Sequence, residues 1–208
     1  MDERLAQRSC EEFTALLASS APTPGGGGAA ALMGALSASL CSMAAHLSRN
    51  KTCCAAWAQS LAEIAELAEG LRCAQLEQID ADAEAFAPLA RAYRLPKDDP
   101  ETAAVMETAL LGACSAPLAM LRLCVQTIPL LERLLEQASP LMLSDVGCAA
   151  ESCRAALECA AMNLWVNTAS LPEERVRDME QECGAARADA LPRIEAVSTA
   201  VREKLVRR

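Results

Sequence analysis

The stretch Thr23-Pro24-Gly25-Gly26-Gly27-Gly28 decides the fold, because it opens a run without formal charge that reaches Leu47. Glycine loses more backbone entropy on ordering than any other residue, so four in a row favour neither a helix nor a strand. Two interpretations stay open. The run is a flexible linker between helices, or it brings backbone close to a ligand, with free N–H groups of the next helix as an anion site. No Gly-Lys-Ser/Thr follows, so this is not a Walker loop.

Beyond the glycines, the pattern predicts a helix over about 29–48. Apolar side chains recur there at steps of four and three: Leu32, Leu36, Leu40, Met43 and Leu47. Beside them runs a ladder of small residues: Ala30, Gly34, Ala38 and Ser42. Because small side chains let neighbouring helices approach closely, this helix is predicted to be central. Glycine, alanine and serine fill most of its positions, so we expect a buried helix of a soluble protein and no membrane partner.

The composition extends this expectation to the whole chain. Of the 208 residues, 52% are hydrophobic and only 2% are aromatic, which favours helices packed through small side chains over a β-sandwich. A net charge of −9 argues against a nucleic-acid partner. The predicted fold is all-α: a single domain over 1–208, built as a bundle of about five to six helices around the small-residue helix.

Helix boundaries follow from periodicity, capping residues and prolines. We expect helices over about 3–19, 29–48, 53–93, 100–138, 144–168 and from 173 onward. Pro117 and Pro129 are expected to kink or break the 100–138 helix.

The eleven cysteines do not form a recognisable framework. Their number is odd, no CxxC pair occurs, and the chain has a single histidine, His46. We therefore interpret them as reduced core residues of a cytoplasmic protein and expect no metal site. Charged residues at 2–4 also argue against a signal peptide.

Asp82 is the candidate for acid–base chemistry. One face of the 53–93 helix carries a mostly apolar stripe: Ile64, Ala68, Leu71, Gln75, Ile79, Asp82, Phe86, Leu89 and Tyr93. Burial disfavours the charged form of a carboxyl group and raises its pKa, which suits an acid or base near neutral pH. The alternative is a structural ion pair between Asp82 and an arginine of another helix.

Three basic residues close this helix: Arg91, Arg94 and Lys97. They are a candidate anion-binding cluster, although the helix dipole alone also explains cations at a helix C-terminus. Arg49 and Lys51, near the end of the central helix, are a second basic pair.

Asn163 and Asn167 lie one turn apart on the 144–168 helix and face the same way. Buried amides need partners, which a polar ligand or a neighbouring helix end would supply. Asp145 precedes Asn163 by 18 residues, about 27 Å along one helix. The two cannot share a pocket within one straight helix, so they serve different functions or another subunit intervenes.

Three segments in order resemble the cyclodeaminase/cyclohydrolase family of folate one-carbon enzymes. They are 22–27 with the small-residue helix, 80–86 leading to 94–97, and 144–147 leading to Asn163 and Asn167. The resemblance covers about 5–168. It implies an all-helical cytoplasmic homodimer that acts on a tetrahydrofolate derivative, with or without a polyglutamate tail, and uses no cofactor beyond that substrate.

By the same resemblance, Asp82 matches the family's proposed catalytic acid/base, and the glycine run lines the folate site. The expected substrate-binding set is Gly25, Gly26, Gly27, Gly28, Arg94, Lys97, Asp145, Asn163 and Asn167. Formiminotetrahydrofolate cyclodeaminase activity is the first expectation, and methenyltetrahydrofolate cyclohydrolase activity is the alternative. A non-catalytic helical dimer or a folate-binding module is the alternative of another class.

Two positions depart from the family pattern. The family usually has a serine where this chain has Gly28, and an asparagine in the stretch before Ser144, where 139–143 has none. Both changes remove polar groups, so they bear on substrate choice and on activity.

Overall fold

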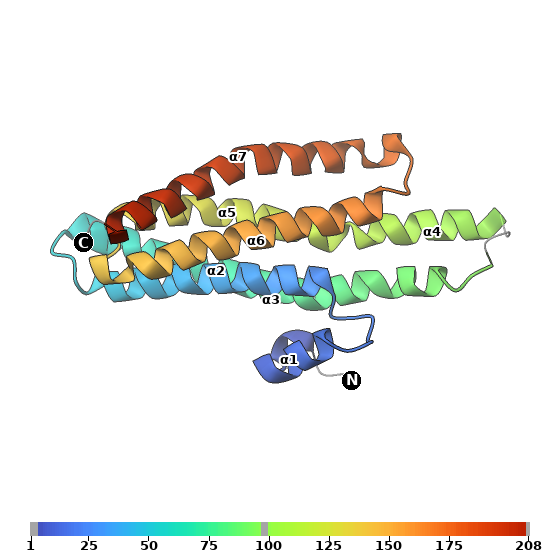
Figure 1. Ribbon diagram of the computed structural model, residues 1–208, viewed down its shortest axis with the longest axis horizontal. Helices are drawn as coiled ribbons and strands as arrows, with labels where there is room; N and C mark the ends of the chain where they lie inside the picture. Colours follow the sequence, from blue (N-terminus) through green and yellow to red (C-terminus); the bar gives the residue numbers. More distant parts are fainter. Residues whose placement is uncertain (1–3, 97–99, 207–208) are drawn as a thin grey trace.

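The computed structural model describes residues 4–96 and 100–206, and in these ranges it contains helices and no strand, as predicted (Figure 1). In chain order the elements are η1 (Leu5–Gln7), α1 (Cys10–Leu17), α2 (Gly26–Arg49), α3 (Ala55–Ala92), α4 (Pro100–Ala113), α5 (Ser115–Gln137), η2 (Pro140–Met142), α6 (Leu143–Thr168) and α7 (Glu173–Val206). Helices α2 to α7 form an elongated bundle, and α1 lies at one side of it (Figure 1).

Helix α2 is central, as predicted, and it contacts α3, α5 and α6. Ala30, Gly34 and Ala38 of the small-residue ladder are buried. A Cβ at Gly34 would lie 2.6 Å from the Gln75 side chain of α3. Glycine is therefore what allows α2 and α3 to approach so closely.

The larger side chains of α2 do not behave as predicted for a helix buried all round. Leu36, Met43 and Leu47 have exposed fractions of 51%, 39% and 45%. Alanine, glycine and serine make up most of the buried residues of α2. Leu32, Met33 and Leu40 are partly buried against the core, whereas Leu36, Met43 and Leu47 lie on the outer side.

Three predicted boundaries are corrected by the structure. The 3–19 helix is instead η1 and α1, separated at Ser9, which forms a capping box with Glu12. The 100–138 helix is α4 and α5, and the break lies at Cys114. Pro117 lies in the first turn of α5, where its missing N–H has no helical acceptor to lose, and Pro129 lies inside α5. Helix α2 begins at Gly26, not at residue 29.

Two further expectations concern membranes and cysteines. Gly26–Arg49 and Glu101–Gln137 are long and apolar enough to cross a membrane by length and composition, but 56% of each apolar window is buried inside the bundle. All eleven cysteines lie in the described residues and are free. The core interpretation is right for five of them and wrong for five exposed ones: Cys10, Cys53, Cys54, Cys73 and Cys148.

Candidate functional site

A cavity of about 150 Å³ lies where the first turn of α2, the second half of α3 and the C-terminal end of α6 meet. Its lining residues are Pro22, Thr23, Gly25, Gly26, Gly27, Asp82, Phe86, Ala113, Asn163, Val166 and Asn167. The fold thus brings together three of the four glycines, the predicted carboxyl group and both predicted asparagines.

The carboxyl group of Asp82 packs directly against the first turn of α2. A Cβ at Gly27 would overlap this carboxyl group, and the backbone N–H of Gly28 donates a hydrogen bond to it. Gly25 is the N-cap, and 26–28 form the first helical turn. The glycine run is therefore a point of close approach and not a flexible linker, and its N–H groups lie at a helix start, where they lack helical acceptors.

The surroundings of Asp82 favour its protonated form. Burial raises the pKa of this carboxyl group above its ordinary value, and the hydrogen bond from Gly28 opposes that shift only in part. No cation contributes to the shift, so among the described residues the ion pair considered above is not formed. Asp82 is also the one titratable side chain among the described residues that line the cavity. A raised pKa makes this carboxyl group better suited to take up and release a proton during a reaction.

The two asparagines use their amide groups differently. Asn163 lies over Gly26, where a Cβ would be 3.3 Å from its amide, and its Nδ2 donates to the Cys159 carbonyl oxygen at 2.8 Å. The Nδ2 of Asn167 donates to the carbonyl oxygen of Ala113 at 3.0 Å. Because Ala113 is the last residue of α4, Asn167 both caps a helix end and lines the cavity. The two alternatives left open for it are therefore compatible.

Gly28 differs from the other three glycines. A Cβ there would lie 3.1 Å from Cβ of Pro24 and 3.9 Å from atoms of Ile79 and Phe13. Its missing side chain faces the packed interior, and its contribution to the site is the backbone N–H given to Asp82. The absence of a serine hydroxyl at this position therefore removes no group from the cavity wall.

Two predicted residues among those that the structure describes, Arg94 and Asp145, do not line this cavity. Arg94 is exposed just beyond the end of α3, and Lys97 lies outside the described residues. Asp145 is in the first turn of α6, at the other end of that helix from Asn163. The stretch 139–143 lies at that end too, where the Ser139 N–H donates to Oγ of Ser48 at 2.8 Å. The substrate-binding roles of these residues stay predictions.

The sequence pattern did not single out every lining residue. Phe86 follows Asp82 by one turn, and Val166 follows Asn163 by three positions, so helical spacing was the available signal for both. Ala113 had no such signal, because its place depends on the break between α4 and α5. No group of three or more His, Cys, Asp or Glu side chains among residues 4–96 and 100–206 is arranged to hold a metal ion.

The chain is similar to known proteins over most of its length. The family model described as formiminotransferase-cyclodeaminase matches residues 9–185. A methenyltetrahydrofolate cyclohydrolase of Methylorubrum extorquens is 41% identical over 179 residues, which cover 82% of this chain and 86% of that protein. The mouse formimidoyltransferase-cyclodeaminase is 25% identical over 83% of this chain, which spans 33% of the mouse protein. The crystal structure of formiminotetrahydrofolate cyclodeaminase from Thermotoga maritima superposes with a TM-score of 0.83 at 26% identity and covers 96% of both chains.

Proposed function

The chain belongs to the formiminotransferase-cyclodeaminase family of folate one-carbon enzymes, and on this premise we propose that it is a methenyltetrahydrofolate cyclohydrolase. The observation that carries the choice is the 41% identity to the Methylorubrum cyclohydrolase over most of both chains. The reaction opens the 5,10-methenyl bridge with water to give the 10-formyl form. This reverses the order of the two activities expected from the sequence alone.

The residues of the cavity suit this hydrolysis. The 5,10-methenyl group is a cation, and Asp82 is the one ionisable side chain on the described wall of the cavity. An approaching cation favours the carboxylate form of Asp82, which accepts a proton from water as the water oxygen attacks the bridge carbon.

The Asp82 carboxyl group also takes part in the ring opening. As the bond between the bridge carbon and N5 breaks, protonated Asp82 returns its proton to N5. The added hydroxyl group then loses its own proton to solvent and becomes the formyl carbonyl, so one proton is released overall. Amide groups of Asn163 and Asn167 and the N–H groups of the α2 start are the uncharged polar groups placed to orient the substrate.

Cyclodeaminase activity is the second candidate, supported by the likeness to the Thermotoga structure. In this reaction N10 attacks the formimino carbon, Asp82 takes the N10 proton, and the proton passes to the departing ammonia. Both reactions use one carboxyl group that gains and loses a proton, so the described residues of the cavity serve either. We propose that the enzyme works in the cytoplasm and needs no cofactor beyond its folate substrate, with or without a polyglutamate tail.

Two assays with purified protein separate the candidates. Methenyltetrahydrofolate is supplied first and the loss of its absorbance is followed, and 5-formiminotetrahydrofolate is then supplied and the gain of methenyl absorbance is followed. Catalysed loss without catalysed gain supports the cyclohydrolase. Catalysed gain overturns it in favour of the cyclodeaminase, and no turnover by folded protein overturns both in favour of a non-catalytic relative.

We also propose that the protein is a homodimer, which pairs through the outer side of α2 and α6. The large exposed side chains of this α2–α6 face are Leu36, Met43, Leu47, Met162 and Val166. On α2 the apolar positions 33, 36, 40, 43 and 47 alternate steps of three and four, the spacing of helices that pack on a partner helix. Val166 also lines the cavity, so the proposed interface borders the site.

This dimer offers a role for Asp145. A two-fold axis perpendicular to the helices runs them antiparallel in the two copies. Residue 154 is halfway between Asp145 and Asn163 and lies near the middle of the α2–α6 face. If the two-fold axis passes at this point, Asp145 of one copy lies at the same height along the bundle as Asn163 of the other copy. Mixing inactive Asp82→Asn with inactive Asp145→Asn is then expected to restore about a quarter of wild-type activity, since half of the dimers hold one intact site. No recovery, or an active Asp145→Asn variant, contradicts the shared site.

A further inference from the structure

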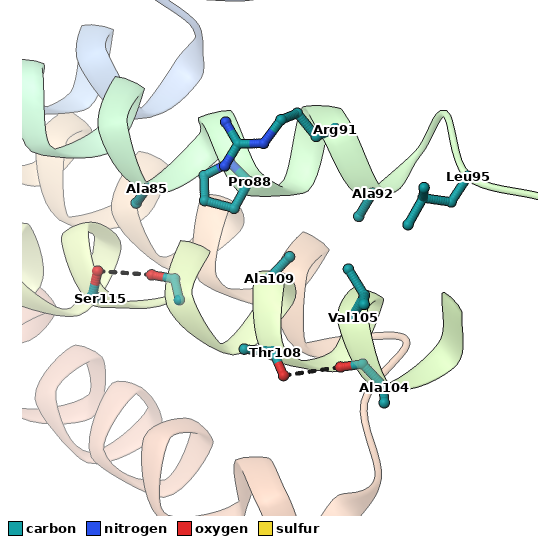
Figure 2. A pocket seen from close by; sticks show the side chains of 11 residues that line it. Ala85, Pro88, Arg91, Ala92, Leu95, Ala104, Val105, Thr108, Ala109 and Ser115 are labelled. Carbon is teal, nitrogen blue, oxygen red and sulfur yellow. Dashed lines mark hydrogen bonds between the residues drawn. The ribbon is translucent and has the colours of Figure 1, made fainter. Parts of the chain in front are cut away.

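A larger groove lies beside the cavity, between α3 and α4 (Figure 2). Its volume is about 690 Å³, against about 150 Å³ for the cavity. Its walls are mostly small and apolar and include Ala85, Pro88 and Ala92 of α3 and Ala104, Ala109 and Gly112 of α4. Small side chains on both helices leave this space open.

Residues that line the groove are next to residues that line the cavity on two helices. Ala85 of the groove and Phe86 of the cavity are neighbours on α3, and Gly112 and Ala113 are neighbours at the end of α4. Ala85 follows Asp82 by less than one helical turn. An elongated ligand with its reacting end at Asp82 can therefore continue into the groove.

Arg91 supplies the positive charge of the groove. Arg91 is among the lining residues, and Figure 2 shows its side chain running back along α3 over Pro88 toward Ala85. Arg91 follows Asp82 by nine residues, about 13 Å along α3. None of the described residues that line the groove is acidic, so Arg91 gives the groove a single sign of charge.

Resting on the proposed folate activity, we propose that this groove binds the p-aminobenzoyl-glutamate arm of the substrate. The cavity is smaller than the roughly 300–1,000 Å³ typical of small-molecule sites, so the arm must lie outside it. A flat benzoyl ring fits an apolar slot with alanine walls, and the glutamate carboxylate that follows pairs with a guanidinium group. Within the basic cluster predicted at the end of this helix, the carboxylate is thereby assigned to Arg91, which lines the groove, and not to Arg94, which does not.

Gly112→Leu tests the slot. A Cβ at Gly112 meets no atom within 4 Å, so a leucine enters the groove without displacing protein. Gly184→Leu on α7 is the matched control, because Gly184 has the same open surroundings. We expect Gly112→Leu to raise KM for the folate substrate at least about tenfold, which corresponds to a loss of about 1.4 kcal/mol of binding free energy. Gly184→Leu should leave KM unchanged. An unchanged KM in Gly112→Leu, or a changed oligomeric state in its place, overturns the proposal.

Arg91→Gln tests the charge. The wild type is expected to prefer the free glutamate acid over its dimethyl ester by about tenfold in kcat/KM, the size of one charge-assisted contact. In Arg91→Gln the two substrates should become equal, while Arg94→Gln and Arg49→Gln keep the preference. Loss of the preference in either of the other two variants, but not in Arg91→Gln, overturns the assignment.

A binding measurement separates failure of this proposal from failure of the proposed function. p-Aminobenzoyl-glutamate is not a substrate, so its binding by calorimetry does not depend on turnover. Saturable binding that Gly112→Leu and Arg91→Gln weaken supports the groove, and absence of binding to a wild type that turns over folate overturns it. If wild type neither turns over folate nor binds the fragment, the proposed function fails first and the groove proposal fails with it.

Discussion

Two carboxyl groups on α3, only two residues apart, have different surroundings. Asp80 accepts a hydrogen bond from Nε of Arg4 at 3.0 Å and another from the Leu5 N–H at 2.7 Å, and so fixes the N-terminal segment to the bundle. Asp82 accepts the Gly28 N–H, has no cation beside it among residues 4–96 and 100–206, and faces the cavity. The sequence around Asp80 is nearly the same as the sequence around Asp82. The difference therefore shows that the role of each carboxyl group is set by the groups that it contacts in the folded chain.

Asp82→Asn is expected to have the largest effect. Asparagine keeps an acceptor for the Gly28 N–H but cannot exchange a proton, so kcat should fall by about 10²–10⁴, the usual contribution of a general acid or base. The fold and the proposed dimer should be retained, as checked by circular dichroism and light scattering. Turnover within a fewfold of wild type would show that Asp82 is not the proton-transfer group.

Gly27→Ala should follow, because its Cβ would overlap the Asp82 carboxyl group. A displaced carboxyl group is expected to lower kcat about a hundredfold, and overpacking should lower the free energy of unfolding by about 1–3 kcal/mol. Gly70→Ala is the control on α3, where a Cβ meets no atom within 4 Å. It should keep full activity and gain up to about 1 kcal/mol, because alanine is the better helix former. Equal behaviour of the two variants contradicts the close approach.

How much of this contrast could be predicted depended on the range of the interactions. The apolar stripe of α3 identified Asp82 as a desolvated carboxyl group, because helical spacing is a local property. That Gly27 and Gly28 would be its neighbours could not be derived from periodicity, since it depends on how α2 and α3 pack. The outward leucines of α2 were misassigned for a related reason: periodicity shows that a stripe exists, but small residues beside it decide which stripe faces the core. Arg4 and Leu5, the partners of Asp80, are likewise distant from it in the sequence, so periodicity could not identify them either.

Asp80→Asn tests the other side of the comparison. It removes the negative charge that accepts hydrogen bonds from Arg4 and Leu5, so the free energy of unfolding should fall by about 1 kcal/mol. In a chain of this size that change lowers Tm by about 2–4 °C. The kcat should stay at the wild-type value, because Asp80 does not line the cavity. Denaturant unfolding and steady-state kinetics measure the two quantities. A loss of activity without a loss of stability would reverse the assignment of the two carboxyl groups.

The smallest expected effect is the pH dependence of stability in Asp82→Asn. Because burial raises the pKa of Asp82 above its ordinary value, protonation favours the folded state. The stability that this group contributes is fully present below the pKa of the unfolded chain and is lost as the pH rises through the folded pKa. Asparagine does not titrate, so the Tm of Asp82→Asn minus that of wild type should be larger at pH 7 than near pH 4. A difference that instead grows toward acid would mean a lowered pKa, and Asp82 would then resemble a structural carboxylate.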